Sequence, residues 1–330
     1  MRAVRHREVS ALLSSWRDDE LLDLLASGGG GSVGVGGDAV TVEVAGAPVF
    51  AKRVPLTDRE LARPHSTANL FGLPVFCQYG VGGPSFNAWR ELAANLAVTE
   101  AVLAGETESF PLLHHWRVLP GRAPVADEHA DVDRVVAALG GDAAVRARME
   151  ALAAARHSLV LFSEYVPRPV EEWLAEDPVG KAASVERQLV GTAEFLRRRG
   201  LLHMDGHFGN MRVDGNTIVL TDFGLVTSPG FDLSADERDF VARHAGHDAD
   251  YAVMRLVNWL VVAVCGVDDL VARNEYVHRC AAGEVPDGVP AVVADVLRRR
   301  AATAARMNDF LWALFDGDVT ARYPAAQDVP

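Results

Sequence analysis

The sequence predicts an α+β protein with two lobes, a small strand-rich N-terminal lobe and a larger, mainly helical C-terminal lobe. In AVTVEVAGAPVFAKRV, valines alternate in two short runs separated at Gly46, which is typical of a β-hairpin. Beyond Pro167, apolar residues recur at helical spacing as far as Phe315, apart from short strands at about 212–222. We therefore place the hinge between the lobes near residues 164–168.

Three regions follow from this division. Residues 1–26 are expected to form a helical extension, because apolar side chains at helical spacing predict one helix over residues 8–26, before a run of glycines. Residues 27–166 are expected to form the N-terminal lobe with insertions, and residues 167–330 the C-terminal lobe. A chain of 330 residues is long enough to bury the cores of two such lobes.

Apolar periodicity predicts further helices over residues 85–103, about 131–155 and 185–199. A buried strand with the sequence HSLVLFS precedes the hinge. Between the hairpin and the first of these helices, residues 54–84 are rich in Pro and Gly, and they are too long for an ordinary connection. This segment is predicted to be an insertion.

The charge of the chain argues against a polynucleotide partner. The 45 acidic and 32 basic side chains give a formal net charge of −13, which repels a phosphate backbone. The longest apolar stretch near the C-terminal end, residues 256–264, is about nine residues long, whereas a bilayer needs roughly 20. We expect neither nucleic acid nor membrane as a partner.

The cysteines and the N-terminus indicate a cytoplasmic protein. Cys77, Cys265 and Cys280 include no C-x-x-C pair, and they resemble buried free thiols of a reducing compartment more than a disulfide or zinc framework. The first residues are interrupted by charge and lack the apolar core and small-residue cleavage site of an export signal.

The strongest chemical signal is the stretch LLHMDGHFGNMRVDGNTIVLTDFGL. Asp205 and Asn210 lie five residues apart among glycines that indicate a loop, and a predicted hairpin then returns the chain to Asp222. This geometry would gather three oxygen-bearing side chains. Phosphoryl transfer uses such a set, because one carboxylate orients the attacking hydroxyl while an amide and a second carboxylate hold Mg²⁺ against the phosphates of a nucleotide.

This stretch resembles the catalytic loop and the magnesium motif of the protein-kinase superfamily. His203, Asp205 and Asn210 match the H, D and N of H-R-D-x-x-x-x-N, and Asp222 begins an unaltered D-F-G. The resemblance implies a bilobal kinase-like fold, with Asp205 as the catalytic aspartate and His203 as a support for the loop backbone. Asn210 and Asp222 would bind the metal. The implied cofactors are ATP and Mg²⁺, and the similarity extends over roughly residues 27–265.

The resemblance also implies a lysine that pairs with the phosphates of ATP. Lys52 in VFAKRV lies on the second strand of the predicted hairpin, as does the lysine of the V-A-I-K motif. Its expected partner is a carboxylate on the next helix, and we choose Glu91 over Glu100 because Glu91 comes earlier in that helix. Lys52 and Glu91 thus join the predicted catalytic residues.

Nucleotide-binding glycines and a hinge are expected in the same lobe. Gly29, Gly31 and Gly34 fit G-x-G-x-x-G, a flexible loop whose N–H groups close over phosphates; a different register of the glycine run, or a plain linker, remains an alternative. Glu164 and Val166 stand where a kinase hinge presents main-chain groups to adenine.

Departures from the protein-kinase pattern bear on the acceptor. Met204 replaces the Arg that pairs with an activation-loop phosphate in many protein kinases, so such a switch has no anchor. Only residues 225–233 precede a predicted helix cap at Ser234, and no A-P-E follows. His207 makes HMDGHFGN similar to the H-G-D-x-H-x-x-N pattern of antibiotic phosphotransferases. It would contact the transferred phosphate or be an ordinary loop histidine.

Three functions fit these residues. The first is an ATP- and Mg²⁺-dependent phosphotransferase acting on a hydroxyl group, above all a serine/threonine protein or peptide kinase, because the D-F-G is intact and the motifs for nucleotide and metal are all represented. The alternatives are an antibiotic-type small-molecule O-phosphotransferase and a nucleotide-binding scaffold without activity. Asp248 or Asp250 is a candidate for the helix acid that braces a kinase catalytic loop. Residues 54–84 and 131–155 have no role in this interpretation.

Overall fold

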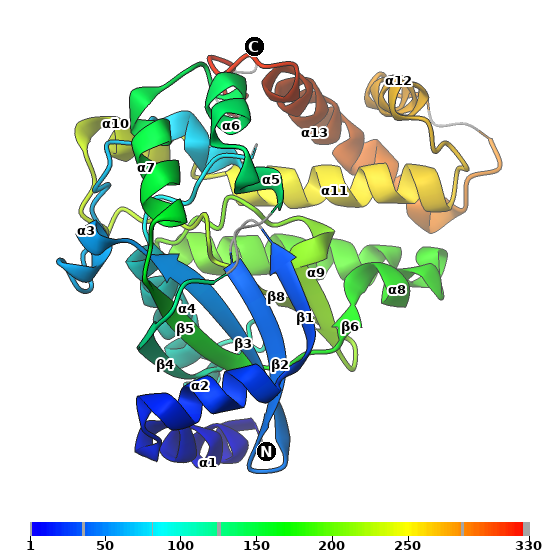
Figure 1. Ribbon diagram of the computed structural model, residues 1–330. Helices are drawn as coiled ribbons and strands as arrows, with labels where there is room; N and C mark the ends of the chain where they lie inside the picture. Colours follow the sequence, from blue (N-terminus) through cyan, green and yellow to red (C-terminus); the bar gives the residue numbers. More distant parts are fainter. Residues whose placement is uncertain (1, 35–36, 81, 124–126, 285–286, 326–330) are drawn as a thin grey trace. The chain divides into compact units, whose positions relative to one another are not determined.

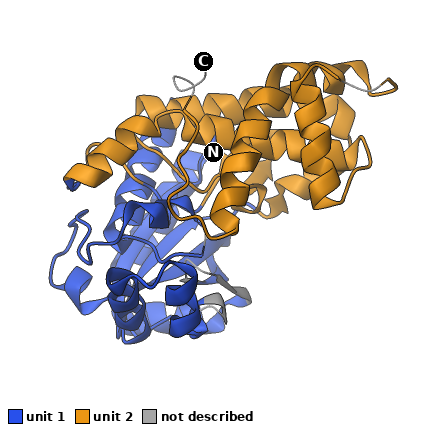
Figure 2. Ribbon diagram, turned by 90° about the horizontal axis from the view of Figure 1, so that it is seen from above, with its two compact units in different colours: residues 1–166, 222–226, 231–234 blue, residues 167–221, 227–230, 235–330 orange. Residues whose placement is uncertain are grey.

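The computed structural model describes residues 2–34, 37–80, 82–123, 127–284 and 287–325 (Figure 1). It confirms the predicted α+β class, with antiparallel sheets and a mainly helical C-terminal region. The chain divides into two compact units (Figure 2). Unit 1 comprises residues 1–166, 222–226 and 231–234, and unit 2 comprises residues 167–221, 227–230 and 235–330.

An antiparallel sheet forms the centre of unit 1. In the described residues its strands are β1 (Gly29–Gly34), β2 (Gly37–Val44), β3 (Ala47–Leu56), β4 (Leu113–Pro120) and β5 (His157–Glu164), in the spatial order β1-β2-β3-β5-β4. The predicted hairpin is β2–β3, and its turn residues Ala45 and Gly46 have φ angles of 54° and 69°. A two-residue turn with both φ angles positive matches the twist of the flanking strands.

The N-terminal extension consists of two helices rather than the single helix predicted over residues 8–26. They are α1 (Arg2–Ser15) and α2 (Asp18–Ser27). Arg17 between them is extended, and its N–H donates to the carboxylate of Glu20 at 2.8 Å. A carboxylate that satisfies a donor at a helix N-terminus starts a new helix there. The apolar spacing continues across this break, which is why the sequence pattern hid it.

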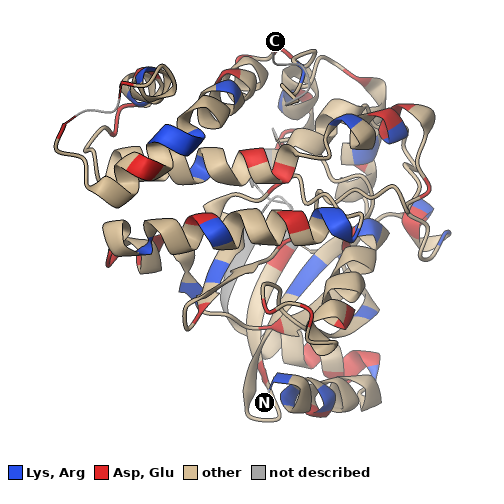
Figure 3. Cartoon of the chain, turned by 180° about the vertical axis from the view of Figure 1, so that it is seen from behind, with Lys and Arg blue, Asp and Glu red and all other residues tan. Residues whose placement is uncertain are grey.

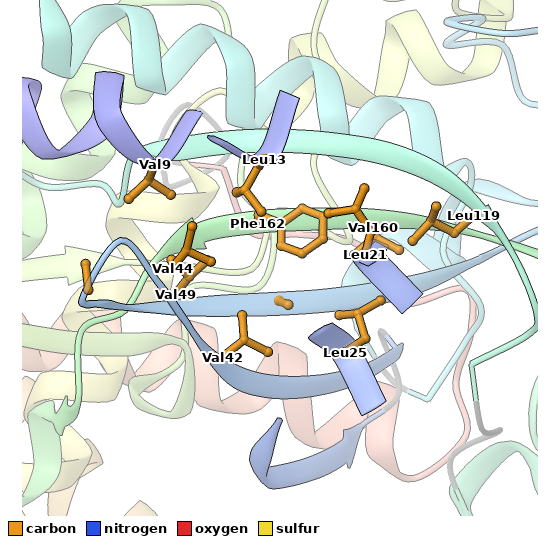
Figure 4. Packing of buried hydrophobic residues seen from close by; sticks show 12 residues of the cluster. Val9, Leu13, Leu21, Leu25, Val42, Val44, Val49, Leu119, Val160 and Phe162 are labelled. Atoms are coloured by element: carbon orange, nitrogen blue, oxygen red, sulfur yellow. The ribbon is translucent and has the colours of Figure 1, made fainter. Parts of the chain in front are cut away.

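Both helices pack on one face of the sheet (Figure 4). Val9 and Leu13 from α1 and Leu21 from α2 are fully buried against strand residues that include Val49 and Phe162. Burial of a Val or Leu side chain contributes roughly 1.5–3 kcal/mol, so these contacts are sufficient to hold short helices on the sheet.

The predicted insertion folds together with the segment after β4. Its regular parts are α3 (Asp58–Leu61) and a 3₁₀ helix (Val75–Tyr79), and α5 (Asp127–Ala130), α6 (Val132–Ala138) and α7 (Ala143–Ala153) come from the later segment. The one helix predicted over 131–155 is therefore two, because Gly140 and Gly141 adopt φ angles of 76° and 75° that end α6.

These two segments share an apolar cluster of their own. It contains Phe71, Leu73, Cys77, Phe86, Val135, Val136, Leu139, Val145 and Met149. We call residues 57–87 and 132–153 together the insertion module. The next helix, α4 (Ala88–Leu103), begins directly after the first part of this module.

Unit 2 is mainly helical. Its described elements are β6 (Arg168–Pro169), α8 (Val170–Ala175), α9 (Pro178–Arg198), β7 (Met211–Asp214), β8 (Thr217–Leu220), α10 (Ala235–Arg243), α11 (His247–Ala263), α12 (Leu270–Ala281) and α13 (Ala291–Phe315). Helix α9 starts before the predicted 185–199 because Asp177 caps it and Pro178 occupies its first turn. Helix α11 packs against α9 and α13, with Leu256, Val257 and Leu260 buried.

Charges of both signs are interspersed along the helices, as Figure 3 shows. Within the described ranges, no helix is long and apolar enough to cross a membrane.

Candidate functional site

The side chain of Lys52 is buried between two carboxylates in unit 1. Lys52 lies in the middle of β3, paired with Ala39 of β2 and Leu161 of β5. Its Nζ lies 2.8 Å from Oε1 of Glu91 and 2.7 Å from Oδ1 of Asp222. Only 10% of the lysine side chain is exposed, so these two bonds are charge-assisted and poorly screened by water.

Burial and neighbouring charges shift the pKa values of Lys52 and Glu91 in opposite directions. Burial alone would lower the pKa of Lys52, but the carboxylates of Asp222 and Glu91 raise it well above its ordinary value. Burial raises the pKa of Glu91 to about 6, against the lowering effect of Lys52. The ammonium ion therefore stays charged at neutral pH, where Glu91 is also mostly ionised.

Lys52 is unusual in the composition of the chain. The sequence contains 30 arginines and only two lysines, Lys52 and Lys181. An ammonium group is a compact charge with three donors, whereas guanidinium is a planar fork, and the two are not interchangeable in a tight site. A lysine at the centre of the sheet in an arginine-rich chain is therefore a second sequence signal for this position, independent of the motif.

Of the two candidate partners of Lys52, the structure shows Glu91, the one favoured from the sequence, in contact with the lysine. Asn87 caps α4 by accepting from the N–H of Trp89, which places Glu91 in the first turn. Glu91 is buried and contacts Lys52, whereas Glu100 is exposed at the other end of the helix.

Asp222 belongs to unit 1 and has a strained backbone. Its φ angle is 63°, which costs a non-glycine residue of the order of 1 kcal/mol or more. Its Oδ1 also accepts from the N–H of Gly224 at 3.1 Å, and a Cβ atom at Gly224 would lie 3.1 Å from that oxygen. Phe223 is fully buried, with its ring 6.0 Å from that of Phe110. Asp222 itself keeps 36% of its side chain exposed.

The other predicted catalytic residues lie in unit 2, on a loop held by α11. Asp248 accepts hydrogen bonds from the backbone N–H of His203 at 2.6 Å and of Met204 at 2.9 Å. Met204 is buried with a φ angle of 66°. The buried ring of His203 has Nε2 3.0 Å from the carbonyl oxygen of Thr221. Of the two candidate helix acids, Asp248 therefore makes the loop contacts, and Asp250 accepts from Tyr323 instead.

Asp205 and Asn210 are close together. Nδ2 of Asn210 donates to the carbonyl oxygen and to Oδ2 of Asp205, at 3.0 and 3.1 Å. The N–H and hydroxyl of Thr221 donate to the carbonyl oxygen of Asn210, and Asp222 is the next residue in the chain. The amide nitrogen of Asn210 is thus engaged, and its amide oxygen is the atom suited to a metal.

The predicted glycine loop is mostly strand. Gly29, Gly31 and Gly34 all lie in β1, which pairs with β2, and the register shifts between Gly29 and Ser32. Residues 35–36 lie outside the described residues. The glycines form a strand because they lie beside the regular strand β2, GDAVTVEV. The backbone N–H and C=O groups of the two strands pair with each other.

Of the two predicted hinge residues, Glu164 is the last residue of β5 and Val166 follows the strand. The N–H of Glu164 donates to the carbonyl oxygen of Leu112 at 2.8 Å, so that group is used within unit 1. The Glu164 carboxylate accepts from Arg2 of α1 at 2.6 Å, a contact that the sequence gave no reason to expect. Val166 is the last residue before the boundary of the units.

The two predicted metal ligands, Asp222 of unit 1 and Asn210 of unit 2, carry oxygen donors. Carboxylate and amide oxygens are hard ligands that suit Mg²⁺, and Asp222 and Asn210 supply one of each. Over the described ranges, no cluster of three or more His, Cys, Asp and Glu side chains is arranged to hold a metal ion.

No protein-family model matches the chain, and a search of curated proteins also gives no match. The function is therefore inferred from these residues and their contacts.

Proposed function

We propose that the protein is an ATP- and Mg²⁺-dependent phosphotransferase that moves the γ-phosphoryl group to an acceptor hydroxyl, as a serine/threonine protein or peptide kinase does. The observation that carries the proposal is the buried Lys52, held by Glu91 and Asp222 in an arginine-rich chain. A buried cation with two carboxylates is costly to build, and a hydrophobic side chain would suit a purely structural strand at least as well.

Lys52 would bind the phosphates of the nucleotide. Its ammonium group donates three hydrogen bonds, two of which are made to Glu91 and Asp222. Glu91 would keep the group oriented while phosphate oxygens replace part of the contact to Asp222. The carboxylate released from Lys52 becomes available as a metal ligand.

Asp205 would accept a hydrogen bond from the acceptor hydroxyl and so direct it at the γ-phosphorus. The amide of Asn210 holds the Asp205 carboxylate in one orientation, which reduces the entropy lost in reaching the transition state. Bound Mg²⁺ would neutralise charge on the phosphates, and Asn210 and Asp222 would be its protein ligands.

The proposal is tested first by binding. ATP at about 100 times its Kd should stabilise the protein by about 2.7 kcal/mol, seen as a raised melting temperature. Asp222→Asn should remove the magnesium-dependent part of this shift and leave the circular dichroism spectrum unchanged. A variant that keeps the full shift would contradict the metal assignment.

Transfer is tested second, with labelled ATP. The purified protein is incubated with ATP and Mg²⁺ alone, with generic protein substrates, and with aminoglycosides as small hydroxyl acceptors. Asp205→Ala is expected to abolish transfer to every acceptor without changing nucleotide binding. Binding without transfer to any acceptor would favour the nucleotide-binding scaffold.

The main alternative is a small-molecule O-phosphotransferase. Two observations favour it: the HMDGHFGN pattern, and the short chain between Asp222 and α10, which begins at Ala235. Such a short segment leaves little surface on which to dock a peptide. Label on aminoglycosides and none on protein substrates would decide for this alternative.

A further inference from the structure

The insertion module contains a fully buried ion pair. Arg148 of α7 donates from Nη1 and Nη2 to the two carboxylate oxygens of Glu60, at 2.8 and 3.0 Å, and neither side chain is exposed. Nε of Arg148 donates to the carbonyl oxygen of Ser85 at 3.0 Å. Two-pronged pairing of this kind fixes both position and angle, because the guanidinium fork matches a carboxylate in one orientation.

Glu60 joins this ion pair to the first turn of α4. Its Oε1 accepts from the N–H of Ala88 at 2.8 Å, and its carbonyl oxygen accepts from Nε1 of Trp89 at 2.9 Å. Ala88 and Trp89 precede Glu91 by three and two residues. A helix is stiff over one turn, so an anchor at Ala88 sets the position of Glu91.

Further contacts fix the same turn to the insertion. Nδ2 of Asn87 donates to the carbonyl oxygens of Ser66 and Ala68, at 2.7 and 3.0 Å. Nε of Arg90 donates to the carbonyl oxygen of Thr67 at 2.7 Å. The helix that bears Glu91 therefore begins on the module and not on a flexible connection.

The module also holds the chain that follows Asp222, within unit 1. The side-chain amide of Gln78 donates to the carbonyl oxygen of Leu225, and the N–H of Asp232 donates to the Thr67 hydroxyl at 2.9 Å. Both carboxylates that contact Lys52 are thus carried on backbone that the module contacts directly.

We propose that Arg148 and Glu60 are positioning residues, which act through the first turn of α4 to hold Glu91 against Lys52. The nucleotide part of this inference rests on the proposed function. The effect of Arg148 and Glu60 on the Lys52–Glu91 contact does not depend on that function.

Because the chain contains only two lysines, the reactivity of Lys52 can be measured directly. Acetylation by an amine-reactive reagent, followed by peptide mass spectrometry, reports Lys52 and Lys181 separately in the full chain. Lys181, beside Glu176 in unit 2, is the internal reference. A protonated, buried ammonium reacts slowly, so loss of the Glu91 contact should accelerate labelling of Lys52.

Arg148→Met is compared with Arg146→Met, its control on the same helix. Arg146 is 43% exposed and pairs with Asp133 and Glu150 at the surface. Arg148→Met is expected to raise the labelling of Lys52 relative to Lys181 at least fivefold, and Arg146→Met to leave it unchanged. Unchanged Lys52 labelling in a folded Arg148→Met protein would overturn the proposal.

If Arg148→Met does not fold, Glu60→Gln and Arg148→Lys are labelled in its place. Glu60→Gln keeps an acceptor for Ala88 but loses the charge that faces Arg148, and it should raise Lys52 labelling too. Arg148→Lys keeps the charge, and its labelling should lie between wild type and Glu60→Gln. Equal labelling in all three folded proteins would refute the positioning role.

The path of the effect is tested in a Glu91→Gln background. If Arg148 acts through Glu91, adding Arg148→Met to Glu91→Gln should change Lys52 labelling by less than twofold. An increase in Lys52 labelling as large as that caused by Arg148→Met alone would mean that the substitution loosens unit 1 in general, and it would count against the proposal.

Nucleotide binding is measured in parallel, and Arg148→Met should weaken ATP–Mg²⁺ binding about tenfold. If wild type shows no nucleotide shift while Lys52 labelling responds as expected, the proposed function fails and the positioning role stands.

Discussion

The carboxylate of Asp248 accepts a 2.6 Å hydrogen bond from the backbone N–H of His203 and thereby ties the start of α11 to the predicted catalytic loop. The next N–H, that of Met204, donates to the other carboxylate oxygen. Burial by itself would raise the pKa of Asp248, but His247, His203 and the backbone donor lower it, so the group is ionised when it accepts both bonds. One charged side chain therefore sets the backbone from which Asp205 projects.

Asp248→Asn should loosen this loop. An amide has one acceptor oxygen where the carboxylate has two, so one of the two backbone donors is left without its partner, at a cost of about 1–3 kcal/mol. We expect a lower melting temperature, faster hydrogen exchange at residues 203–205 and a large loss of phosphotransfer. Asp250→Asn is the control, because Asp250 accepts from the Tyr323 hydroxyl instead of from the loop backbone. Equal exchange in the two variants would contradict this account.

Lys52→Met should destabilise unit 1 and abolish nucleotide binding. Removing one partner of a buried ion pair leaves an uncompensated charge, which costs about 3–5 kcal/mol. Lys52→Arg should bind nucleotide at least tenfold more weakly, since the planar fork does not fit between Glu91 and Asp222. Lys181→Arg is the matched control and should behave as wild type. Thermal melts with and without ATP–Mg²⁺ measure both effects.

The sequence was sufficient for the local parts of the site. The hairpin that bears Lys52 follows from alternating valines and a two-residue turn, and the partner Glu91 follows from its place in the next helix. Both depend on short-range patterns of period two or 3.6. The roles of these residues in catalysis remain predictions.

The contacts that hold the site together were not predictable in the same way. Glu60 and Arg148 are 88 residues apart and carry no local signal, because an arginine in an amphipathic helix normally lies at the surface. The helix breaks at Arg17 and at Gly140 were missed because apolar spacing continues on either side of each. The glycine run fits more than one register of G-x-G-x-x-G, and only the strand pairing fixes residues 29–34.

Acid should destabilise unit 1 through His114. Burial lowers the pKa of His114 to about 4, with smaller contributions from His6, Arg5 and Arg2 and opposition from Glu164. The unfolded chain binds this proton below pH about 6.5 and the folded chain only near 4, so stability falls as the pH drops through that window. The loss at the acid end is about 3 kcal/mol.

His114→Asn removes that titration. Between pH 7 and pH 4.5, the melting temperature of the variant should fall less steeply than that of wild type. His278→Asn, at an exposed histidine on α12, provides the comparison. Parallel curves for wild type and His114→Asn would rule out His114 as the source of the acid sensitivity.

Gly209→Ala tests whether His207 takes part in the reaction. A Cβ atom at Gly209 would lie 2.7 and 2.8 Å from Cε1 and Nδ1 of His207, so the imidazole must move. In the native position its Nε2 lies 3.7 Å from Oδ2 of Asp205. We expect Gly209→Ala and His207→Ala to lower the phosphotransfer rate by the same factor, about tenfold. Gly206→Ala is the matched control, because a Cβ atom there meets no protein atom within 4 Å. A normal rate in Gly209→Ala would mean that His207 is an ordinary loop residue.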